Sequence, residues 1–237
     1  MRIGLLECDE VTGRFAQISG GYRDMFAALL PEARFSYYEA HKGRQPGAPG
    51  ECDAWLCTGS RYSAYDTMPW VGALARFIRD VHESKKPFVG ICFGHQILAH
   101  ALGGKVAKAP GGWGVGVLEV EILANEAWMR PARERLRIQH MHQDQVMRLP
   151  PGSVVLGRSE HCEIGMFRIG ETMLGIEGHP EFTREFGEAL IRARMERIGK
   201  ARGEAALESL AQPTDSALLG RWIESFIRSG RRGSRSA

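Results

Sequence analysis

Short apolar runs alternate with amphipathic stretches along most of the chain. Runs of about four or five apolar residues are typical of buried strands, and apolar positions that recur every three or four residues predict helices. Strands are predicted at 3–6, 35–38, 54–57, 87–91, 117–123, 137–141, 154–156, 164–167 and 173–176. Helices are predicted at 22–30, 69–81, 95–102, 183–198, 201–210 and 215–227. This alternation predicts an α/β fold, with an open, mostly parallel, doubly wound sheet covered by helices on both faces.

Two stretches depart from the parallel pattern. Residues 117–123 alternate apolar and acidic side chains, which predicts an antiparallel strand with one face in water. The glycine-rich residues 110–116 lack the G-x-G-x-x-G spacing between a strand and a helix, so no dinucleotide site is expected there. We expect these residues to form a hairpin turn beside the functional pocket.

A single cysteine marks the turn between the strand at 87–91 and the helix at 95–102. Cys92 stands two residues after Gly90 and two residues before Gly94, which is the nucleophile-elbow pattern with cysteine in the usual serine position. Glycine is expected at both positions because a side chain would crowd the tight crossing of strand and helix. The amides and dipole of the following helix favour thiolate over thiol. The pattern predicts that Cys92 is a nucleophile.

A general base is available at the end of a later strand. His179 follows the predicted strand at 173–176 and could take or share the thiol proton. Glu181, two residues on, could bond the far ring nitrogen and so fix the tautomer and orientation of the ring. A buried structural cysteine and a loop histidine are the plainer interpretation of either residue alone. Their order, with each residue at a strand end, favours the catalytic interpretation.

The segments around these residues carry a family resemblance. The sequences GICFGHQ (90–96) and GHPEF (178–182) resemble the two signature blocks of class I, or triad, glutamine amidotransferase domains, of the stand-alone, GMP-synthetase glutaminase-like type. The resemblance implies a flavodoxin-like sheet, with Cys92 as the nucleophile, His179 as the acid and base, and Glu181 as its orienting residue. In such domains the thiolate attacks the side-chain amide of glutamine, ammonia leaves, and water hydrolyses a γ-glutamyl thioester. No cofactor is expected.

The same resemblance implies an oxyanion hole. Its donors would be the backbone amides of Phe93 and of the turn at Gly59 and Ser60. The family usually shows two glycines and then proline here, whereas this chain has Gly59, Ser60 and Arg61. A backbone donor survives that change, but serine is less free than glycine in its dihedral angles, so either Gly59 or Ser60 supplies the second amide.

A substrate pocket is also implied by the resemblance. Gln96, four residues after the nucleophile, matches the family glutamine that helps to hold the amino-acid end of the substrate. The sequence HQDQV (142–146) matches a His-x-Asp-x-Val segment that closes the same pocket. This implicates His142, Gln143 and Asp144 in substrate binding. The alternative interpretation of these three side chains is a polar exit from a strand into a loop.

Composition and charge limit the other possibilities. The 237 residues are 43% hydrophobic and 25% charged, which is typical of a soluble globular protein. Four arginines and no acidic residue lie in 228–237, so the remaining chain is nearly neutral and nucleic-acid binding is not expected. We predict a catalytic domain over 1–200, a C-terminal helical extension over 201–228 and a basic, disordered tail over 229–237.

The cysteines and the start of the chain indicate the compartment. The five cysteines are an odd number, and the chain starts without a long apolar segment. We therefore expect a cytoplasmic protein with no disulfide framework and no contact with membranes. His140 and His142 alternate on one predicted strand, which is metal-ligand geometry in principle, but no third ligand is evident and no metal site is expected.

Three functions remain open from the sequence. The first is an amidotransferase-like enzyme that hydrolyses the γ-amide of glutamine or of a γ-glutamyl conjugate, with ammonia released or passed to a separate synthetase. The second is a γ-glutamyl peptidase acting alone, which follows the same thioester route with a larger leaving amine. The third is a non-catalytic regulatory protein, against which the intact Cys92, His179 and Glu181 argue. The size of the pocket beside Trp113 and residues 58–65 should discriminate the first two.

Overall fold

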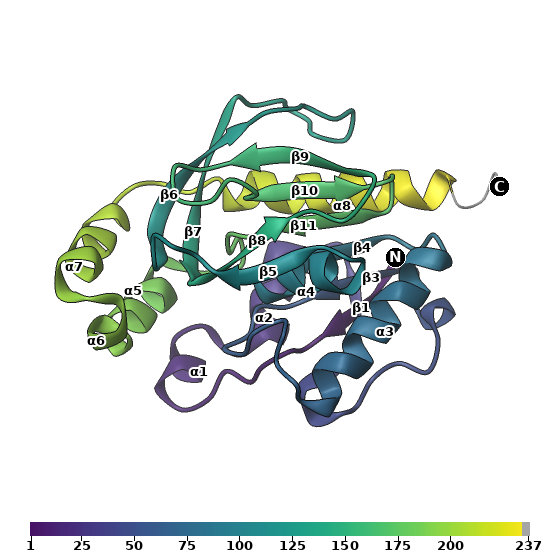
Figure 1. Cartoon of the computed structure of the whole chain (residues 1–237), viewed down its shortest axis with the longest axis horizontal. Coiled ribbons are helices and arrows are strands. Elements are labelled where there is room, and N and C mark those ends of the chain that lie inside the picture. The colour runs from purple at the N-terminus through teal and green to yellow at the C-terminus, as the bar shows by residue number, and fades with distance from the viewer. Residues whose placement is uncertain (234–237) are drawn as a thin grey trace.

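The computed structural model describes residues 1–233 and contains one large mixed sheet, one small sheet and helices on both sides of the large one (Figure 1). The strands are β1 (Arg2–Leu6), β2 (Arg34–Tyr38), β3 (Ala54–Cys57), β4 (Phe88–Ile91), β5 (Lys105–Lys108), β6 (Gly114–Ile122), β7 (Arg135–His142), β8 (Asp144–Arg148), β9 (Ser153–Arg158), β10 (Met166–Ile169) and β11 (Met173–Ile176). The helices are α1 (Arg14–Ser19), α2 (Tyr22–Leu29), α3 (Pro69–Glu83), α4 (Phe93–Ala101), α5 (Arg184–Ala193), α6 (Met195–Ile198), α7 (Lys200–Ser209) and α8 (Ser216–Gly233). Two short 3₁₀ helices span Ala40–Lys42 and Pro49–Glu51.

The large sheet combines a parallel half and an antiparallel half. Its strand order is β2-β1-β3-β4-β11-β10-β9-β6-β7. The strands from β2 to β11 pair in parallel, and β10, β9, β6 and β7 extend the sheet with antiparallel pairs. The predicted α/β class is confirmed, and so is the antiparallel strand at 117–123, which is part of β6. The small sheet is the antiparallel pair β5 and β8.

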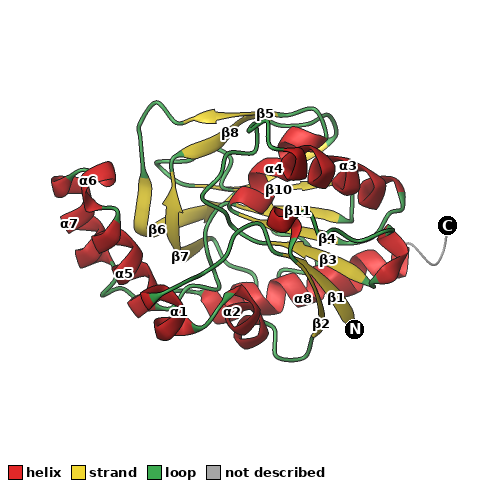
Figure 2. Cartoon of the chain, turned by 90° about the horizontal axis from the view of Figure 1, so that it is seen from below, coloured by secondary structure: helices red, strands yellow, loops and turns green. Residues whose placement is uncertain are grey.

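Side chains of the parallel strands alternate between two hydrophobic cores because successive residues of a strand point to opposite faces. Ile3 and Leu5 of β1 pack in the core that contains α2 and α8. Leu6 of the same strand packs in the core that contains α3 and α4. Figure 2 shows these two helix pairs on opposite sides of the sheet. The strands β1, β3, β4 and β11 are therefore buried on both faces, which accounts for their continuous apolar runs, whereas the edge strand β2 is exposed or half-buried.

The C-terminal helix differs from its prediction. It runs over Ser216–Gly233 instead of 215–227, so residues 229–233 of the predicted disordered tail are helical. Residues 234–237 of that tail lie outside the described part of the chain. The helix continues because its last turns have contacts: Gly230 is buried beside Pro87, and Arg231 pairs with Asp53 at 2.9 Å. Since α8 packs on the main sheet, it forms part of the core of the fold.

Some other elements also differ from the predictions. The expected hairpin at 110–116 is wrong, because β5 pairs with β8 in the small sheet while β6 pairs with β7 and β9 in the large one. The expected helix at 183–198 is interrupted at Arg194, where φ is −109° and ψ is 10°. The elements α1, β5 and β8 were not predicted, since they are short and largely polar. None of the helices described within 1–233 combines the length and apolar composition needed to cross a membrane.

Candidate active site

The predicted elbow lies between β4 and α4. Cys92 adopts a φ of 51° and a ψ of −103°, a strained conformation for a residue that is not glycine. Its amide donates to the Ile176 carbonyl at 2.9 Å, and its carbonyl accepts the Gln96 amide at 2.9 Å. A side chain at Gly90 would overlap the Gly94 carbonyl, and one at Gly94 would overlap the Cys57 carbonyl. The two glycines are therefore required for the close crossing that the sequence predicted.

His179 reaches the same cleft from the loop after β11. Its Nδ1 lies 2.8 Å from Glu181 Oε1, and its backbone amide donates to the Gln139 carbonyl at 2.7 Å. A Cβ at Gly59 would lie 2.9 Å from His179 Cε1 and 3.7 Å from Cys92 Cβ, so the Gly59 turn fits closely against both residues. Cys92 and His179 line one cavity. The structure thus brings the three residues of the predicted triad together, and their catalytic roles stay a prediction.

The surroundings of the thiol differ from the expectation of a ready thiolate. Burial raises the pKa of Cys92 well above its ordinary value, and the nearby carboxyl groups of Glu177 and Glu181 raise it further. The Phe93 amide and the Arg194 guanidinium oppose this shift without reversing it. The helix amide expected to favour the thiolate is therefore present, but burial outweighs it. The raised pKa favours a neutral thiol, which needs a base to accept its proton before the sulfur can act as a nucleophile.

The oxyanion loop is held by its side chains. Ser60 Oγ donates to the Cys8 carbonyl at 2.8 Å, and Arg61 Nε pairs with Asp9 at 2.8 Å. Within residues 1–233, the backbone amides of Gly59 and Ser60 donate to no protein acceptor. Both amides therefore remain available to a bound oxyanion. Their use, together with the Phe93 amide, stays a prediction.

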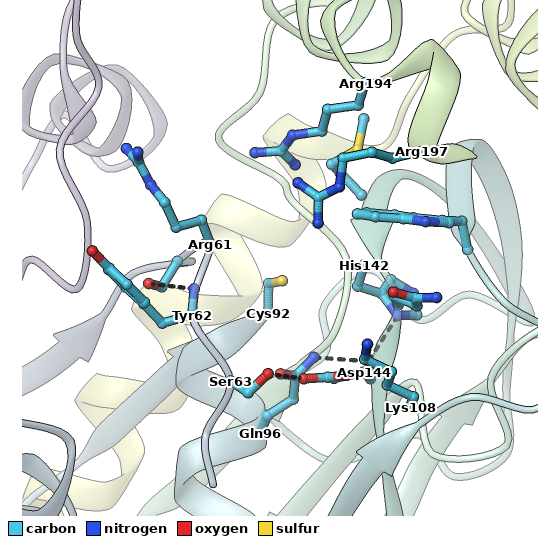
Figure 3. A pocket seen from close by; sticks show the side chains of 14 residues that line it. Arg61, Tyr62, Ser63, Cys92, Gln96, Lys108, His142, Asp144, Arg194 and Arg197 are labelled. Atoms are coloured by element: carbon cyan, nitrogen blue, oxygen red, sulfur yellow. Dashed lines mark hydrogen bonds between the residues drawn. The ribbon is translucent and has the colours of Figure 1, made fainter. Parts of the chain in front are cut away.

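The four residues predicted to bind substrate gather on one side of Cys92 (Figure 3). Gln96, His142, Gln143 and Asp144 line a cavity of about 180 Å³, together with Lys108 and Trp113, and we call this part of the cleft the polar arm. Gln96 Nε2 donates to the Asp144 carbonyl at 2.9 Å and to Glu177 Oε1 at 2.7 Å. The Asp144 carboxylate accepts from Ser63 Oγ at 2.5 Å. These hydrogen bonds hold the Gln96 side-chain amide in the wall of the polar arm.

A second cavity continues from Cys92 on the side of His179. It measures about 330 Å³, and its walls include Phe15, Phe182, Phe186 and Leu190. We call it the aromatic arm. Cys92, Ser60, Arg61, Met141, Arg194 and Arg197 line both arms. The nucleophile therefore stands where the two arms meet.

Two arginines were missed by the sequence analysis. Arg194, at the interruption between α5 and α6, and Arg197, within α6, reach the cleft (Figure 3). Burial lowers the pKa of Arg194, but a guanidinium stays charged at neutral pH. The Arg197 guanidinium lies 5.4 Å from the centre of the Trp113 ring. Their three-residue spacing shortly after the GHPEF segment was the available signal, because residues three apart share a helix face.

Glu177 was also missed. Its side chain is fully buried beneath the cleft, with Oε1 bonded to Gln96 and Oε2 3.4 Å from His95 Nε2. Burial raises the pKa of Glu177 well above its ordinary value, and the hydrogen bond from Gln96 opposes this shift. The residue stands two positions before His179, but its burial could not be deduced from that spacing.

The paired histidines lie as expected without forming a metal site. His140 Nδ1 and His142 Nε2 are 3.2 Å apart, which confirms that the two side chains share one face of β7. In the described part of the chain, no group of three or more histidine, cysteine, aspartate or glutamate residues is arranged to hold a metal ion.

Comparisons with known proteins show what this chain is similar to. A family model described as glutamine amidotransferase class-I matches residues 53–197. Gamma-glutamyl peptidase 3 of Arabidopsis thaliana is 31% identical over 178 residues, which cover 70% of this chain and 71% of that protein. One subunit of the glutamine-hydrolyzing GMP synthase of Pyrococcus abyssi is 32% identical over 137 residues, which cover 57% of this chain and 72% of that subunit.

A solved structure shows the same fold. The crystal structure of a glutamine amidotransferase from Thermotoga maritima matches with a TM-score of 0.76 and 22% sequence identity, over 98% of each chain. The family match at 53–197 includes both Cys92 and His179. The two segments that carried the resemblance in the sequence therefore lie within the matched region.

Proposed function

Because the chain belongs to the class-I glutamine amidotransferase family, as its two signature segments predicted, we propose that it hydrolyses γ-glutamyl amides through a thioester on Cys92. The observation that carries this proposal is the shared cavity of Cys92 and His179, with Glu181 2.8 Å from the far ring nitrogen. A thiol, a base and a group that orients the base are the three parts that nucleophilic acyl transfer needs.

The first half of the reaction forms the thioester. The Cys92 thiol gives its proton to His179 Nε2, and the sulfur bonds to the γ-carbonyl carbon of the substrate. The Phe93 amide and one amide of the Gly59-Ser60 turn stabilise the oxyanion. The carbon–nitrogen bond then breaks, and the leaving nitrogen takes its electron pair and the proton from His179. This releases an amine, or ammonia when the substrate is glutamine.

The second half uses water. A water molecule gives a proton to His179 as its oxygen attacks the thioester carbon. The carbon–sulfur bond breaks, the sulfur recovers a proton from His179, and glutamate leaves. Glu181 accepts a hydrogen bond from the Nδ1 side of the ring throughout, so Nε2 stays directed at the reacting atoms.

Positive charge around the polar arm supports a γ-glutamyl substrate. Lys108, Arg194 and Arg197 line this arm. The γ-glutamyl group carries an α-carboxylate, and an arginine binds a carboxylate through a planar fork of N–H donors. We assign the α-carboxylate to Arg194 and Arg197, and the rest of the polar arm to the amino-acid end of the substrate. His142, Gln143 and Asp144 form its opposite wall.

A second candidate function is supply of ammonia to a separate synthetase. The similarity to one subunit of a GMP synthase favours it. A donor of this kind should hydrolyse glutamine slowly alone and faster with its synthetase, because uncoupled hydrolysis wastes glutamine. We place either enzyme in the cytoplasm. The five cysteines are free, and the Cys8 and Cys57 sulfurs lie 3.3 Å apart without a bond, as suits a reducing compartment.

The experiment is glutamate release from glutamine and from a panel of γ-glutamyl peptides. We expect Cys92→Ala to abolish release, and Cys52→Ala, which removes another buried free cysteine outside both arms, to retain it. Cleavage of peptides by the isolated chain would favour the peptidase, and slow cleavage of glutamine alone would favour the ammonia donor. Release that continues in Cys92→Ala would contradict both.

A further inference from the structure

The two arms of the cleft differ in chemistry, and only one of them contains the proton donor. The polar arm is lined by Gln96, Lys108, His142, Gln143 and Asp144. The aromatic arm is lined by His179, by polar and charged side chains that include Asp9, Glu10, Arg61, Arg194 and Arg197, and by an apolar set from α1, α5 and the loops before them: Val11, Phe15, Phe182, Phe186, Leu190 and Ala193. The arms meet at Cys92, so an amide that reacts there has one half on each side.

The position of His179 indicates which half of the substrate amide occupies each arm of the cleft. The leaving nitrogen must receive its proton as the carbon–nitrogen bond breaks, so it must lie within hydrogen-bond reach of the His179 ring. His179 lines the aromatic arm and not the polar arm. The acyl half of the substrate therefore occupies the polar arm, and any group attached to the leaving nitrogen extends into the aromatic arm.

The aromatic arm presents a row of rings that begins at His179. The Phe182 ring stacks on the His179 ring, with centroids 3.9 Å apart and an angle of 8° between the planes. Phe186 follows at 4.7 Å from Phe182, and Phe15 at 6.3 Å from Phe186, both edge to face. A further aromatic ring can pack against these rings in the same edge-to-face or offset-stacked contacts.

The size of this arm exceeds what ammonia needs. A water molecule, similar in size to ammonia, occupies about 30 Å³ of liquid, and an apolar cavity of about 150 Å³ is enough to bind benzene. The aromatic arm measures about 330 Å³. The acids at its rim are already paired, Asp9 with Arg61 at 2.8 Å and Glu10 with Lys42 at 3.4 Å. An apolar group of ring size therefore fits the volume of the arm beside its aromatic side chains, and neither of these two acids presents an unpaired charge to it.

We propose that the aromatic arm is the leaving-group subsite, and that the enzyme prefers γ-glutamyl amides whose amine carries an apolar, ring-sized group. This inference rests on the proposed function, because it takes His179 as the donor of the leaving proton. Phe15, Phe186 and Leu190 determine this specificity, and Phe182 both lines the subsite and supports the His179 ring.

The test compares three substrates that share the γ-glutamyl half: glutamine, γ-glutamyl-ethylamide and γ-glutamyl-phenethylamide. The two alkylamines differ mainly in the ring, so their ratio of kcat/KM reports the aromatic arm. We expect the phenethylamide to be cleaved with a kcat/KM about tenfold or more above that of the ethylamide, since burial of an apolar side chain of this size is worth that much.

Two variants test whether the preference for the phenethylamide arises in the aromatic arm. Phe15 is only half-buried, and Phe15→Ala should lower the phenethylamide to ethylamide ratio about tenfold. Ala193 is exposed where it borders the arm, and Ala193→Trp should fill the arm and lower the same ratio. The matched control is Phe35→Ala, another half-buried phenylalanine that borders neither arm and should keep the ratio.

The outcomes separate the two proposals. Cys92-dependent cleavage of all three amides with equal kcat/KM, or a ratio that neither Phe15→Ala nor Ala193→Trp lowers, would overturn the leaving-group subsite and leave the thioester chemistry intact. Failure of all three amides to be cleaved in a Cys92-dependent manner would overturn the proposed function, and the subsite with it.

Discussion

At the scale of single residues, Cys92 combines a strained backbone with a thiol whose ionisation is disfavoured. Cys92 has a positive φ, held by the tight crossing of β4 and α4. Its thiol is buried beside two carboxyl groups, which raises its pKa. Such a thiol stays neutral until a base is aligned with it, so the fold limits unwanted reactions of the sulfur while no substrate is bound.

This description predicts how the thiol reacts with alkylating agents. Iodoacetamide attacks the thiolate, so the rate for Cys92 should rise with pH around a midpoint above about 8.5, the ordinary thiol value. Glu177→Gln removes a carboxyl group that raises the pKa of Cys92, and should move the midpoint to lower pH. Mass spectrometry of the Cys92 peptide measures the rate. A wild-type midpoint below the ordinary value would contradict the prediction.

The spacing of residues predicted only part of the site. Cys92, Gly90 and Gly94 belong to one local turn, whose requirements can be deduced from a few neighbouring positions. The His179–Glu181 contact is equally local. The placement of Glu177 depends on burial by distant elements, which leaves no local pattern in the sequence. The placement of Arg194 depends on an interruption between two helices, which the three-residue spacing of Arg194 and Arg197 does not by itself reveal.

At the scale of elements, α8 contributes large side chains to the hydrophobic core. It was predicted as part of a helical extension, yet Trp222 and Phe226 are almost fully buried in the core that also contains β1 and α2. Trp222 Nε1 also donates to the Pro131 carbonyl at 3.3 Å. The strand and helix alternation predicted most parallel elements, but it could not show that a helix near the C-terminus packs beside the first strand.

Truncation of Trp222 tests this packing. Trp222→Ala should lower the free energy of unfolding by about 3–5 kcal/mol, the usual range for a buried aromatic residue that leaves a cavity. The matched control is Arg221→Ala, an exposed change on the same helix, for which we expect a change within about 0.5 kcal/mol. Urea denaturation measures both. A loss below about 1 kcal/mol for Trp222→Ala would show that α8 contributes little to the core.

At the scale of the whole molecule, stability depends on a set of buried neutral histidines. Burial lowers the pKa of His95 and of His140 to about 3, and lowers that of His142 well below its ordinary value. A histidine whose folded pKa is depressed does not destabilise the fold above its unfolded pKa of about 6.5, and it costs stability as the pH falls below that value. The raised pKa of Glu177 has the opposite effect on stability. The stability that the protonated carboxyl group contributes is present at low pH and is lost as the pH rises.

These shifts predict acid unfolding. Below about pH 6, the three histidines should lower the free energy of unfolding by up to about 4 kcal/mol for each pH unit, at about 1.4 kcal/mol for each group, and the raised pKa of Glu177 should offset about one group's share of this slope. Urea denaturation at several pH values measures this slope. His140→Gln should reduce the slope by one group's share, about 1.4 kcal/mol for each pH unit, whereas the exposed His100→Gln should leave it unchanged. A flat profile from pH 6.5 to 5 would contradict the neutral buried histidines.

The whole fold was more predictable than the shape of its cleft. The alternation of apolar runs and amphipathic stretches predicted the α/β class because the parallel strands β1, β3, β4 and β11 are buried on both faces. The two arms of the cleft are made by side chains from the loops, β7, β8, α1, α5 and α6, which lie far apart in the sequence. Their volumes and linings depend on the assembled molecule, so the sequence left glutamine and larger γ-glutamyl amides as alternatives.

The central claim is that Cys92 carries a γ-glutamyl thioester, and rapid acid quenching followed by intact-mass measurement tests it most directly. During turnover of a γ-glutamyl amide, we predict a fraction of the protein heavier by one γ-glutamyl group, with the added mass on the Cys92 peptide and none in Cys92→Ala. Turnover at an equal rate in Cys92→Ala, or an added mass on a different residue, would contradict the account.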